Sequence, residues 1–296
     1  MKLFGVTFTY NESIMIPYVM KYLEHMGFNK LIVYDNQSTD NTVKLLKQYK
    51  FVEVRTLDTG GKKSNSEIVN VKNKVWKEFR HEKDAWMFVS DFDEVLYYPG
   101  SLKEYLEQKS KEGYNCLNQE MMETVCEHFP DKSKFVHEVC DGGTFWDHGC
   151  KMTLFKVGEF DTIKYAPGAH SVEVTLNNGK KLKSLNDKEI KSFHLKWIDY
   201  KFCLSKKNLA QSRRGKDDIK HGYGTHYIIS DDEFKKKWDI RKSKLVSVNN
   251  YTTGKVRGCN AIGKIVEIIR TKPTIGESEY PNIVMKINNR KIVKKK

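Results

Sequence analysis

The stretch AWMFVSDFDEV, residues 85–95, places an apolar run directly before three carboxylates. The run AWMFV has the composition of a strand buried on both faces, as in a parallel sheet. Asp91, Asp93 and Glu94 follow at once, although neighbouring carboxylates repel one another. Ligands of open parallel sheets bind beyond the carboxyl ends of the strands. The stretch therefore predicts a buried strand that delivers acidic side chains to a binding site.

Strands and helices alternate over the hundred residues that contain this stretch. Loops of a few residues join the expected elements, which are strands at 3–10, 29–36, 51–58 and 85–95 and helices at 13–27, 39–50 and 64–83. The alternation predicts a parallel sheet with right-handed crossovers. The fold class expected from the pattern is therefore α/β, of the kind that binds nucleotides.

The rhythm changes after residue 100. A helix is expected at 101–113 and is followed by strand-like pieces with turns. Residues 193–213 are expected to start as a strand and to continue as a helix, and 231–245 have the pattern of a charged helix. No internal repeat or long low-complexity linker interrupts the chain, which favours one continuous domain with a C-terminal elaboration.

The composition limits the classes of partner. The 296 residues are 39% hydrophobic, which indicates an ordinary globular protein. The formal net charge of +14 favours an anionic partner such as nucleic acid, a nucleotide, an acidic glycan or a membrane surface. A lysine-rich composition typical of AT-rich genomes explains the same charge without any partner.

Cysteine spacing and hydropathy bear on the compartment. The six cysteines form no CxxC pair, which argues against a zinc site and favours free thiols in a reducing compartment. No apolar run approaches the ~18–20 residues that span a bilayer, and the N-terminus lacks a cleavage-site pattern. We expect a protein of the cytoplasm, or of the host cytoplasm if the source is viral, with peripheral attachment to a membrane as an alternative.

The acidic cluster after the fourth strand suits a hard divalent cation. On an extended backbone Asp91 and Asp93 project to the same side, about 7 Å apart. Two carboxylates so placed fit Mn²⁺ or Mg²⁺, which fills its other positions with water and phosphate oxygens. A solvated acidic turn is the alternative, but the position directly after a buried strand favours the metal.

Two other strand ends carry polar residues. TFTYNES, residues 7–13, ends the first strand with Tyr10, Asn11 and Glu12, and VYDNQSTDNT, residues 33–42, ends the second strand with Asp35 and Asn36. A carboxylate at such a strand end can accept hydrogen bonds from a base or a ribose. Three strands are thus expected to deliver polar groups to one edge of the sheet.

In chain order, the motifs TYNE, D-N-x-S-T-D and D-x-D-E resemble the nucleotide-sugar-binding half of GT-A glycosyltransferases, in the family-two-like branch. The resemblance covers residues 3–100. It implies a Rossmann-like GT-A fold, with a mostly parallel central sheet flanked by helices and a helical, basic C-terminal elaboration. The expected parts are a nucleotide-sugar-binding half at 1–100, an acceptor-binding half at 101–230 and a basic helical extension at 231–296.

The resemblance also implies roles for individual residues. The nucleotide-sugar site would include Thr9, Tyr10, Glu12, Asp35, Asn36, Lys62 and Asp91, with Asp35 on the base and Lys62 facing the diphosphate. Asp93 would be the direct ligand of the metal, with Asp91 near it. Many GT-A enzymes complete the metal shell with a late histidine. His194 fits that position better than His170.

The catalytic base is harder to place. An inverting GT-A enzyme uses a carboxylate to deprotonate the acceptor hydroxyl, whereas a retaining enzyme does not need this base. Asp147, in GGTFWDHGCK at 142–151, is the first candidate because aromatic residues beside an acid suggest a sugar platform. Asp141 and Glu138 are the alternatives.

These features predict a metal-dependent glycosyltransferase with a nucleotide-sugar donor, a UDP-sugar in the first instance. The acceptor hydroxyl would lie on a glycan, a lipid-linked glycan, a protein or a modified DNA base. A nucleotidyltransferase is the rival enzyme, but it normally carries a glycine-rich, basic loop after strand one, and TYNES lacks it. A non-catalytic protein that binds nucleic acid or membranes through its +14 charge is the rival from another class.

Overall fold

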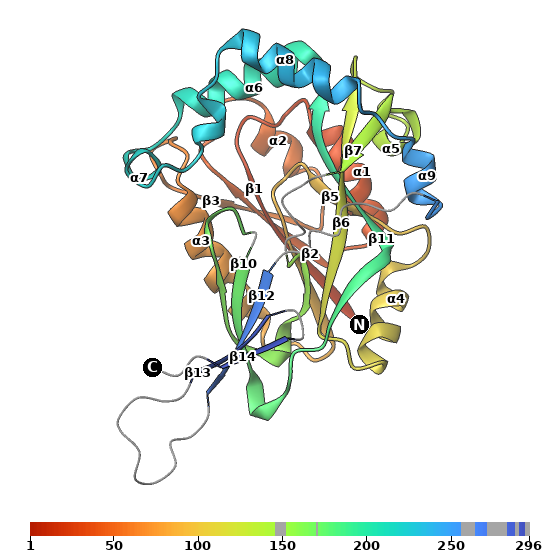
Figure 1. The fold of residues 1–296 in the computed structure, drawn as a ribbon, viewed down its shortest axis with the longest axis vertical. Coiled ribbons are helices and arrows are strands. Elements are labelled where there is room, and N and C mark those ends of the chain that lie inside the picture. The colour runs from red at the N-terminus through yellow and green to blue at the C-terminus, as the bar shows by residue number, and fades with distance from the viewer. Residues whose placement is uncertain (146–151, 170, 256–263, 271–282, 288–289, 294–296) are drawn as a thin grey trace.

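The computed structural model describes residues 1–145, 152–169, 171–255, 264–270, 283–287 and 290–293. Its centre is a sheet in which the strands follow the order β3-β2-β1-β4-β8-β6-β11-β5, with β7 paired to β6. Helices flank this sheet, and a second sheet lies beside it (Figure 1). Within the described ranges, no helix has the length and apolar character that a membrane crossing needs.

The first four strands run parallel to one another. They are β1 (Lys2–Thr9), β2 (Lys30–Asp35), β3 (Val52–Thr56) and β4 (Ala85–Val89). The helices between them are α1 (Ile16–Met26), α2 (Thr42–Leu46), α3 (Asn65–Lys74) and the 3₁₀ helix η1 (Val75–Phe79). The predicted alternation is confirmed.

The other half of the sheet mixes directions. Its strands are β5 (Glu94–Tyr97), β6 (Cys116–Cys126), β7 (Gly142–Phe145), β8 (Leu154–Lys156) and β11 (Ser184–Ile198). The strands β6 and β11 pair parallel to each other, whereas β8 is antiparallel to both β4 and β6. Most strands therefore share the direction of β1, and the predicted α/β class with a mostly parallel central sheet is confirmed.

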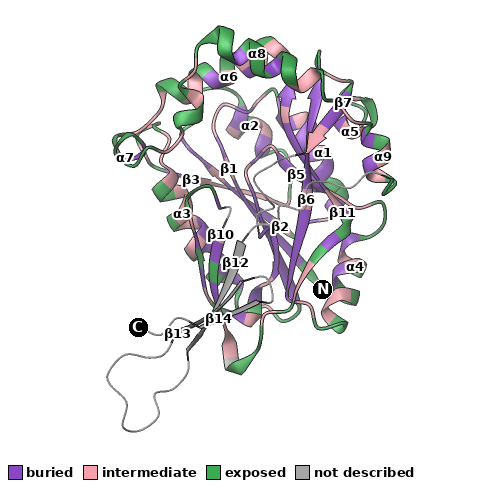
Figure 2. Ribbon diagram, viewed as in Figure 1, coloured by how far each residue is buried: buried purple, intermediate pink, exposed green. Residues whose placement is uncertain are grey.

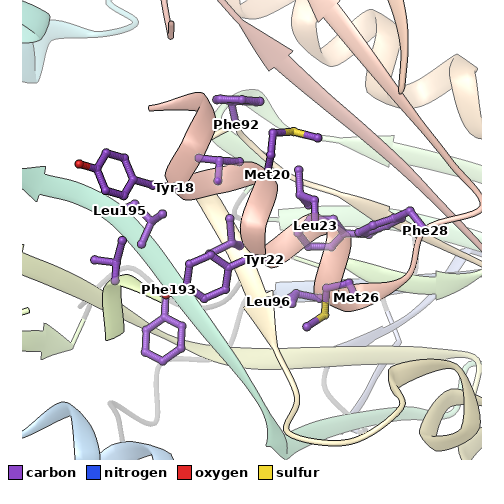
Figure 3. Packing of buried hydrophobic residues seen from close by; sticks show 14 of the residues in the cluster. Tyr18, Met20, Tyr22, Leu23, Met26, Phe28, Phe92, Leu96, Phe193 and Leu195 are labelled. Carbon is purple, nitrogen blue, oxygen red and sulfur yellow. The ribbon is translucent and has the colours of Figure 1, made fainter. Parts of the chain in front are cut away.

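The core lies on both faces of this sheet because successive strand residues point to opposite sides. In β4, Trp86 and Phe88 pack into one apolar cluster with α1, whereas Met87 packs into another with η1 and the second sheet. Figure 2 shows the central strands buried, and Figure 3 shows the first cluster, where α1 meets Phe92, Phe193 and Leu195. Burial on both faces explains the continuous apolar runs in the sequence.

Local sequence signals set the ends of α1. Pro17 occupies the first turn, where its missing N–H costs nothing. Gly27 ends the helix in the left-handed region, at φ 70°, which glycine adopts without strain. In β1, a Cβ on Gly5 would lie 2.6 Å from Leu31 Cδ1, so the close packing of β1 against β2 requires glycine there.

The chain after residue 100 adds further helices. They are α4 (Leu102–Lys111), α5 (Val136–Val139), α6 (Tyr200–Ser212), α7 (Lys216–Lys220), α8 (Asp231–Lys242) and α9 (Val248–Thr252), with the 3₁₀ helices η2 (Val157–Glu159), η3 (Pro167–Ala169), η4 (Asn177–Gly179) and η5 (Thr225–Tyr227). The expected change from strand to helix within 193–213 is confirmed at the junction of β11 and α6. Asp199, at φ 57°, makes this junction, and its side chain accepts a hydrogen bond from Phe202 N at 3.0 Å.

The second sheet differs from the helical extension expected at 231–296. The helices α8 and α9 lie in that range, but β12 (Lys264–Arg270), β13 (Ile283–Ile287) and β14 (Arg290–Val293) follow them. They continue the sheet formed by β9 (Phe160–Tyr165) and β10 (Ser171–Leu176), with β12 parallel to β10. The runs KIVEIIR and IVMKI are rich in β-branched residues, which favour strands over helices despite the surrounding lysines.

Candidate active site

Polar residues from three strand ends meet at one edge of the central sheet. The order β2-β1-β4 places these strands side by side, and Thr9 of β1 pairs with Asp35 of β2 at the carboxyl end of both strands. We call this edge the rim, and it consists of Thr9, Tyr10, Glu12, Asp35, Asn36, Asp91 and Asp93. The structure therefore brings together the residues that the sequence placed at the three strand ends.

The D-N-x-S-T-D motif braces the loop that follows β1. Ser38 Oγ accepts a hydrogen bond from Asn11 N at 2.8 Å, and Asp40 Oδ2 accepts one from Ser13 N at 3.2 Å. Thr42 Oγ1 accepts the backbone N–H of Glu12 at 2.7 Å. These hydrogen bonds hold the backbone around Glu12 in one conformation. Part of the motif therefore stabilises the loop that follows β1.

Glu12 and Asp93 share one cation, the ammonium group of Lys206 on α6. Lys206 Nζ lies 2.7 Å from Glu12 Oε1 and 3.8 Å from Asp93 Oδ2. Glu12 is buried, and its second carboxylate oxygen, Oε2, has no hydrogen-bond partner. Two carboxylates from the loops after different strands thus contact one lysine from a helix more than a hundred residues later.

Charge and burial set the ionisation of this cluster. Burial raises the pKa of Glu12, although the Lys206 charge opposes this effect. Burial alone would also raise the pKa of Asp93, but the charges of His194 and Lys206 outweigh it and lower that pKa below its ordinary value. Burial would lower the pKa of Lys206, and Glu12 and Asp93 instead raise it. Asp93 is therefore a carboxylate and Lys206 an ammonium ion near neutral pH.

His194 approaches Asp93 from β11. It pairs in register with Glu94 of β5, and Leu195 N donates a hydrogen bond of 2.7 Å to Asp93 O. This register brings His194 Nε2 to 3.5 Å from Asp93 Oδ2. His194 thus lies beside Asp93, and its role as a metal ligand stays a prediction.

A buried carboxylate stands behind His194. Glu123 of β6 is 1% exposed, and its Oε1 lies 3.7 Å from His194 Nδ1. The Nη1 group of Arg241 and the indole N–H of Trp197 contact the other oxygen of Glu123. The guanidinium of Arg241 lies 4.3 Å from the centre of the Trp197 ring. Trp197 is buried and helps to hold the carboxylate of Glu123 that faces the histidine.

Asp91 and Asp93 do not project side by side. Strand β4 ends at Val89 and β5 begins at Glu94, so the residues between them form a turn and the extended geometry expected from the sequence is wrong. Asp91 Oδ1 lies 3.1 Å from the buried Nζ of Lys72 on α3, whereas Asp93 faces His194 and Lys206. Glu94 Oε2 accepts the backbone N–H of Asp91 at 3.4 Å, and so it braces the turn.

Asp35 and Asn36 already have partners inside the protein. Asp35 accepts hydrogen bonds from the backbone N–H and the hydroxyl of Ser38, at 2.9 and 2.5 Å. Asn36 Nδ2 donates to Lys62 O at 2.9 Å, and its Oδ1 accepts from Thr59 at 2.6 Å. Both side chains are buried and hold the loops at the edge of the rim, so a contact of Asp35 with a base stays a prediction.

The aromatic ring of Tyr10 is covered by a cation. The guanidinium carbon of Arg213, at the end of α6, lies 3.1 Å from the centre of this ring, and Arg213 Nε donates to Gly61 O at 2.8 Å. Burial lowers the pKa of Arg213. The planar guanidinium of Arg213 stacks on one face of the Tyr10 ring. A nucleobase is also planar and can stack on an aromatic ring in the same way.

Of the two lysines in TGGKKSN, Lys63 faces the cluster. Lys62 is exposed, whereas Lys63 Nζ lies 4.7 Å from the centre of the Tyr227 ring. The charge of Lys63 lowers the pKa of the Tyr227 hydroxyl. The resemblance assigned Lys62 to the diphosphate, and that assignment stays a prediction.

Of the three candidates for the catalytic base, two lie within the described residues. Glu138 is exposed, and its Oε2 accepts the backbone N–H of Phe135 at 2.9 Å. Asp141 is exposed, and its carboxylate accepts the backbone N–H of Glu127 at 2.6 Å, near the end of β6. Asp147 lies outside the described residues, as does His170. The assignment of a base to Glu138, Asp141 or Asp147 therefore stays a prediction.

The acidic cluster suits a divalent cation only in part. Among the described side chains, no group of three or more His, Cys, Asp or Glu residues is arranged to hold a metal. Asp93 and His194 converge, and Glu12 adds a buried oxygen that has no hydrogen bond. These donors fit an ion that takes few protein ligands and completes its shell with phosphate oxygens and water.

Several residues of this site were not found by sequence analysis. They are Lys72, Glu123, Lys206, Tyr227 and Arg241. Lys72, Lys206 and Arg241 lie on helices, Glu123 lies on β6, and Tyr227 lies on η5. A lysine inside the pattern KFCLSKKNLA carries no local signal that separates a buried partner of carboxylates from an exposed residue.

The first half of the chain matches a family of known enzymes. The model for glycosyltransferase family 92 matches residues 5–141, just under half of the chain. The match includes the three strand ends of the rim. The prediction that the chain is a glycosyltransferase is thereby confirmed. No curated protein matches the sequence.

Solved structures show only distant likeness. A crystal structure of S. aureus TarS, residues 1–349, has 14% sequence identity and a TM-score of 0.39, and the match covers 85% of this chain and 74% of that one. A 4-diphosphocytidyl-2C-methyl-D-erythritol synthase from Anaerococcus prevotii has 7% identity and a TM-score of 0.29, covering 53% of this chain and 70% of that one. Neither likeness carries any weight for function at these scores.

Proposed function

We propose that this glycosyltransferase takes its sugar from a nucleotide diphosphate donor, with UDP-sugars as the first candidates, and that the donor binds at the rim. The observation that carries the proposal is the cluster of Glu12, Asp93, His194 and Lys206 at the carboxyl ends of β1 and β4. A divalent cation would balance the carboxylates of this cluster, and the diphosphate would balance the ammonium of Lys206. The same strand ends carry the Tyr10 ring for the base.

Asp93 and His194 are the residues that would hold Mn²⁺ or Mg²⁺ in this proposal. Such an ion, when bound, supplies charge stabilisation to the departing nucleotide diphosphate. The charges around Asp93 keep it ionised, so it is ready to bind a cation without losing a proton first. Glu123 and Arg241 fix the ring of His194 from behind, which keeps its Nε2 directed at Asp93.

The nucleoside would lie between the ends of β1 and β2. Thr9 and Asn36 are buried there, and Thr9 Oγ1 has no hydrogen-bond partner. The hydroxyl of a ribose or a polar atom of the base would satisfy that buried group, whose desolvation is otherwise uncompensated. Tyr10 would stack on the base, as implied by the resemblance to GT-A enzymes.

For the acceptor we propose a hydroxyl group of a glycan. A lipid-linked glycan, a protein or a modified DNA base would present the same chemistry. The formal charge of +14 and the exposed lysines of α8, Lys235, Lys236 and Lys237, favour an acceptor that carries negative charge.

A donor screen tests the proposal. UDP-, GDP- and dTDP-sugars are added with and without Mn²⁺, and both the melting temperature and the release of free nucleotide diphosphate are measured. A donor present at 100 times its Kd stabilises the folded state by about 2.7 kcal/mol, which raises the melting temperature by several degrees. We expect one nucleotide class to give this shift with Mn²⁺ and to release its diphosphate slowly into water.

The same screen exposes the rivals. Consumption of a nucleoside triphosphate with release of pyrophosphate would indicate a nucleotidyltransferase. Binding of DNA that weakens steeply with salt, without any turnover of nucleotide sugars, would indicate a non-catalytic nucleic-acid-binding protein. The absence of any shift or turnover with every donor would contradict the proposed function.

A further inference from the structure

Two successive lysines on α6 have different environments. Lys207 Nζ donates to the backbone oxygen of Ile229 at 3.0 Å and lies 2.8 Å from Asp231 Oδ1, so it fastens α6 to the start of α8. Lys206 contacts the carboxylates of Glu12 and Asp93, and its ammonium lies 5.7 Å from the centre of the Phe202 ring. Lys207 thus connects two helices, whereas Lys206 balances negative charge at the rim.

The position of Lys206 coincides with the site where a divalent cation would be expected. Asp93 is the residue proposed to hold that cation, and Lys206 Nζ lies 3.8 Å from its Oδ2. The side chain of Lys206 is 31% exposed, whereas those of Glu12 and Asp93 are 10% and 20% exposed. Carboxylates so far from solvent need a positive partner, and the ammonium provides it.

We propose that Lys206 is the resident cation of the donor site: it neutralises Glu12 and Asp93 while no donor is bound, and it moves to the donor's diphosphate when a divalent metal takes over the carboxylates. The inference rests on the proposed function and adds a positioning residue to it. The lysine stem has four rotatable methylenes and its ammonium is a compact point charge, so a move between neighbouring anions needs no movement of the helix.

Charge balance gives the direction of the exchange. A divalent cation near Glu12 and Asp93 neutralises both carboxylates and repels the ammonium of Lys206 at close range. The diphosphate that arrives with the metal is then the nearest strong anion, and Lys206 pairs with it. Lys206 consequently weakens the binding of a metal ion without nucleotide and strengthens the binding of the nucleotide. Metal and nucleotide therefore favour each other's binding through this residue, and such coupling is reciprocal.

The opposite signs of these two effects define the experiment. Binding of Mn²⁺ without nucleotide, and binding of UDP in the presence of EDTA, are measured separately by calorimetry on the full chain. In Lys206→Met we expect Mn²⁺ alone to bind about tenfold more tightly and UDP alone to bind about tenfold more weakly. Lys206→Arg keeps the charge, so we expect both dissociation constants to return toward the wild-type values.

Lys201→Met is the matched control. Lys201 is exposed on the same helix, and its substitution removes the same charge without touching the rim. We expect it to change both constants less than twofold, since an exposed charge is largely screened by salt. If Lys201→Met changed them as much as Lys206→Met does, the effect would come from net charge, and the inference would be overturned.

A second pair of variants covers the event that Lys206→Met does not fold. Glu12→Gln removes the buried carboxylate, so Glu12→Gln/Lys206→Met no longer buries an unpaired charge. The comparison of this double variant with Glu12→Gln is expected to show the same opposite changes. If the affinities for Mn²⁺ and for UDP changed in the same direction, or if neither changed, the proposed movement of Lys206 would be contradicted. Failure of the wild type to bind any nucleotide sugar would contradict the proposed function instead, and the Mn²⁺ measurement would still report on Lys206.

Discussion

The rim and the segment that closes over it differ in charge and in origin. The rim comes from the strand ends of the first hundred residues and is acidic, with Glu12, Asp91 and Asp93. The segment Tyr200–Tyr227, from α6 to η5, which we call the cover, brings Lys206 and Arg213. Each region alone would hold unbalanced charge near the protein interior. The site is electrostatically complete only when both are in place.

Hydrogen bonds from its backbone and from one buried side chain attach the cover to the first half of the chain. Lys63 N donates to Arg213 O at 2.8 Å, and Gly215 N donates to Lys63 O at 3.1 Å. The fully buried carboxylate of Asp218 accepts both the backbone N–H and the side-chain amide of Asn65, each at 2.9 Å. The carboxylates of the site therefore come from the strand ends, and the cations come from the cover, which hydrogen bonds hold in place.

The largest expected effect separates the two carboxylates of the rim. We expect Asp93→Asn to lower the rate of sugar transfer about 10³-fold, because the amide can neither hold a divalent cation nor pair with Lys206. Asp91→Asn is the matched substitution, and we expect a loss of about tenfold or less because Asp91 faces Lys72. Steady-state rates with the donor found by the screen test this. Equal losses in both variants would mean that the two carboxylates act as one unit.

The next effect concerns the support of His194. Arg241→Met leaves the carboxylate of Glu123 buried without its cation, and we expect the free energy of unfolding to fall by about 3 kcal/mol. Glu123→Gln/Arg241→Met removes both charges, and we expect it to recover most of this loss. Urea denaturation of the two variants measures the difference. A double variant as unstable as the single one would show that the charge pair is not the source of the stability.

Gly215→Ala tests the fastening between the two regions. A Cβ at this position would lie 2.9 Å from Lys63 O, a backbone atom that cannot move by itself, so the two strands of backbone must separate. We expect the free energy of unfolding to fall by about 1–2 kcal/mol and the affinity for UDP to fall with it. Gly60→Ala, in the loop that contains Lys63, is the contrasting case: nothing lies within 4 Å of its Cβ, and strain at φ 61° is its only cost. Unchanged UDP binding in Gly215→Ala would mean that the cover does not contribute to the donor site.

A smaller effect is expected at the aromatic ring of the rim. Tyr10→Ala removes the face on which a base would stack, and we expect the affinity for UDP to fall about tenfold, or about 1.4 kcal/mol. Tyr10→Phe keeps the ring and should bind UDP almost as the wild type does. Calorimetric titration with UDP and Mn²⁺ distinguishes the two. Weak binding in both variants would assign the effect to the hydroxyl group instead of the ring.

The smallest effect lies outside both regions, at His137 in α5. Burial lowers the pKa of this imidazole to about 4, and its Nδ1 lies 2.9 Å from the hydroxyl of Tyr22. The unfolded chain takes up the proton near pH 6.5, whereas the folded chain does not, so stability is lost as the pH falls from about 6.5 to about 4. We expect His137→Gln to reduce this loss by about 1 kcal/mol, allowing for partial solvent exposure. Parallel stability curves for variant and wild type would contradict the assignment.

Sequence patterns located the rim but not the details of its geometry. The strand ends at Thr9, Asp35 and Val89 follow from apolar runs that stop at polar residues, and all three lie at one edge as expected. The side-by-side projection of Asp91 and Asp93 assumed that the strand continued through them. The chain turns there instead, because β5 leaves β4 to pair with β11 on the far side of the sheet. Such a pairing involves residues a hundred positions apart and leaves no local trace.

By itself, the sequence determined the order of strands and helices in the first hundred residues, the α/β class and the acidic strand ends. These depend on periodicity and on short motifs, which act over a few residues. Only the tertiary structure decided that Lys206 pairs with Glu12 and Asp93, that Arg213 stacks on Tyr10, and that Lys72 pairs with Asp91. A charged side chain on a helix is solvated or buried according to what packs against it. That packing is fixed by contacts between residues remote in the chain, and so it cannot be inferred from local patterns.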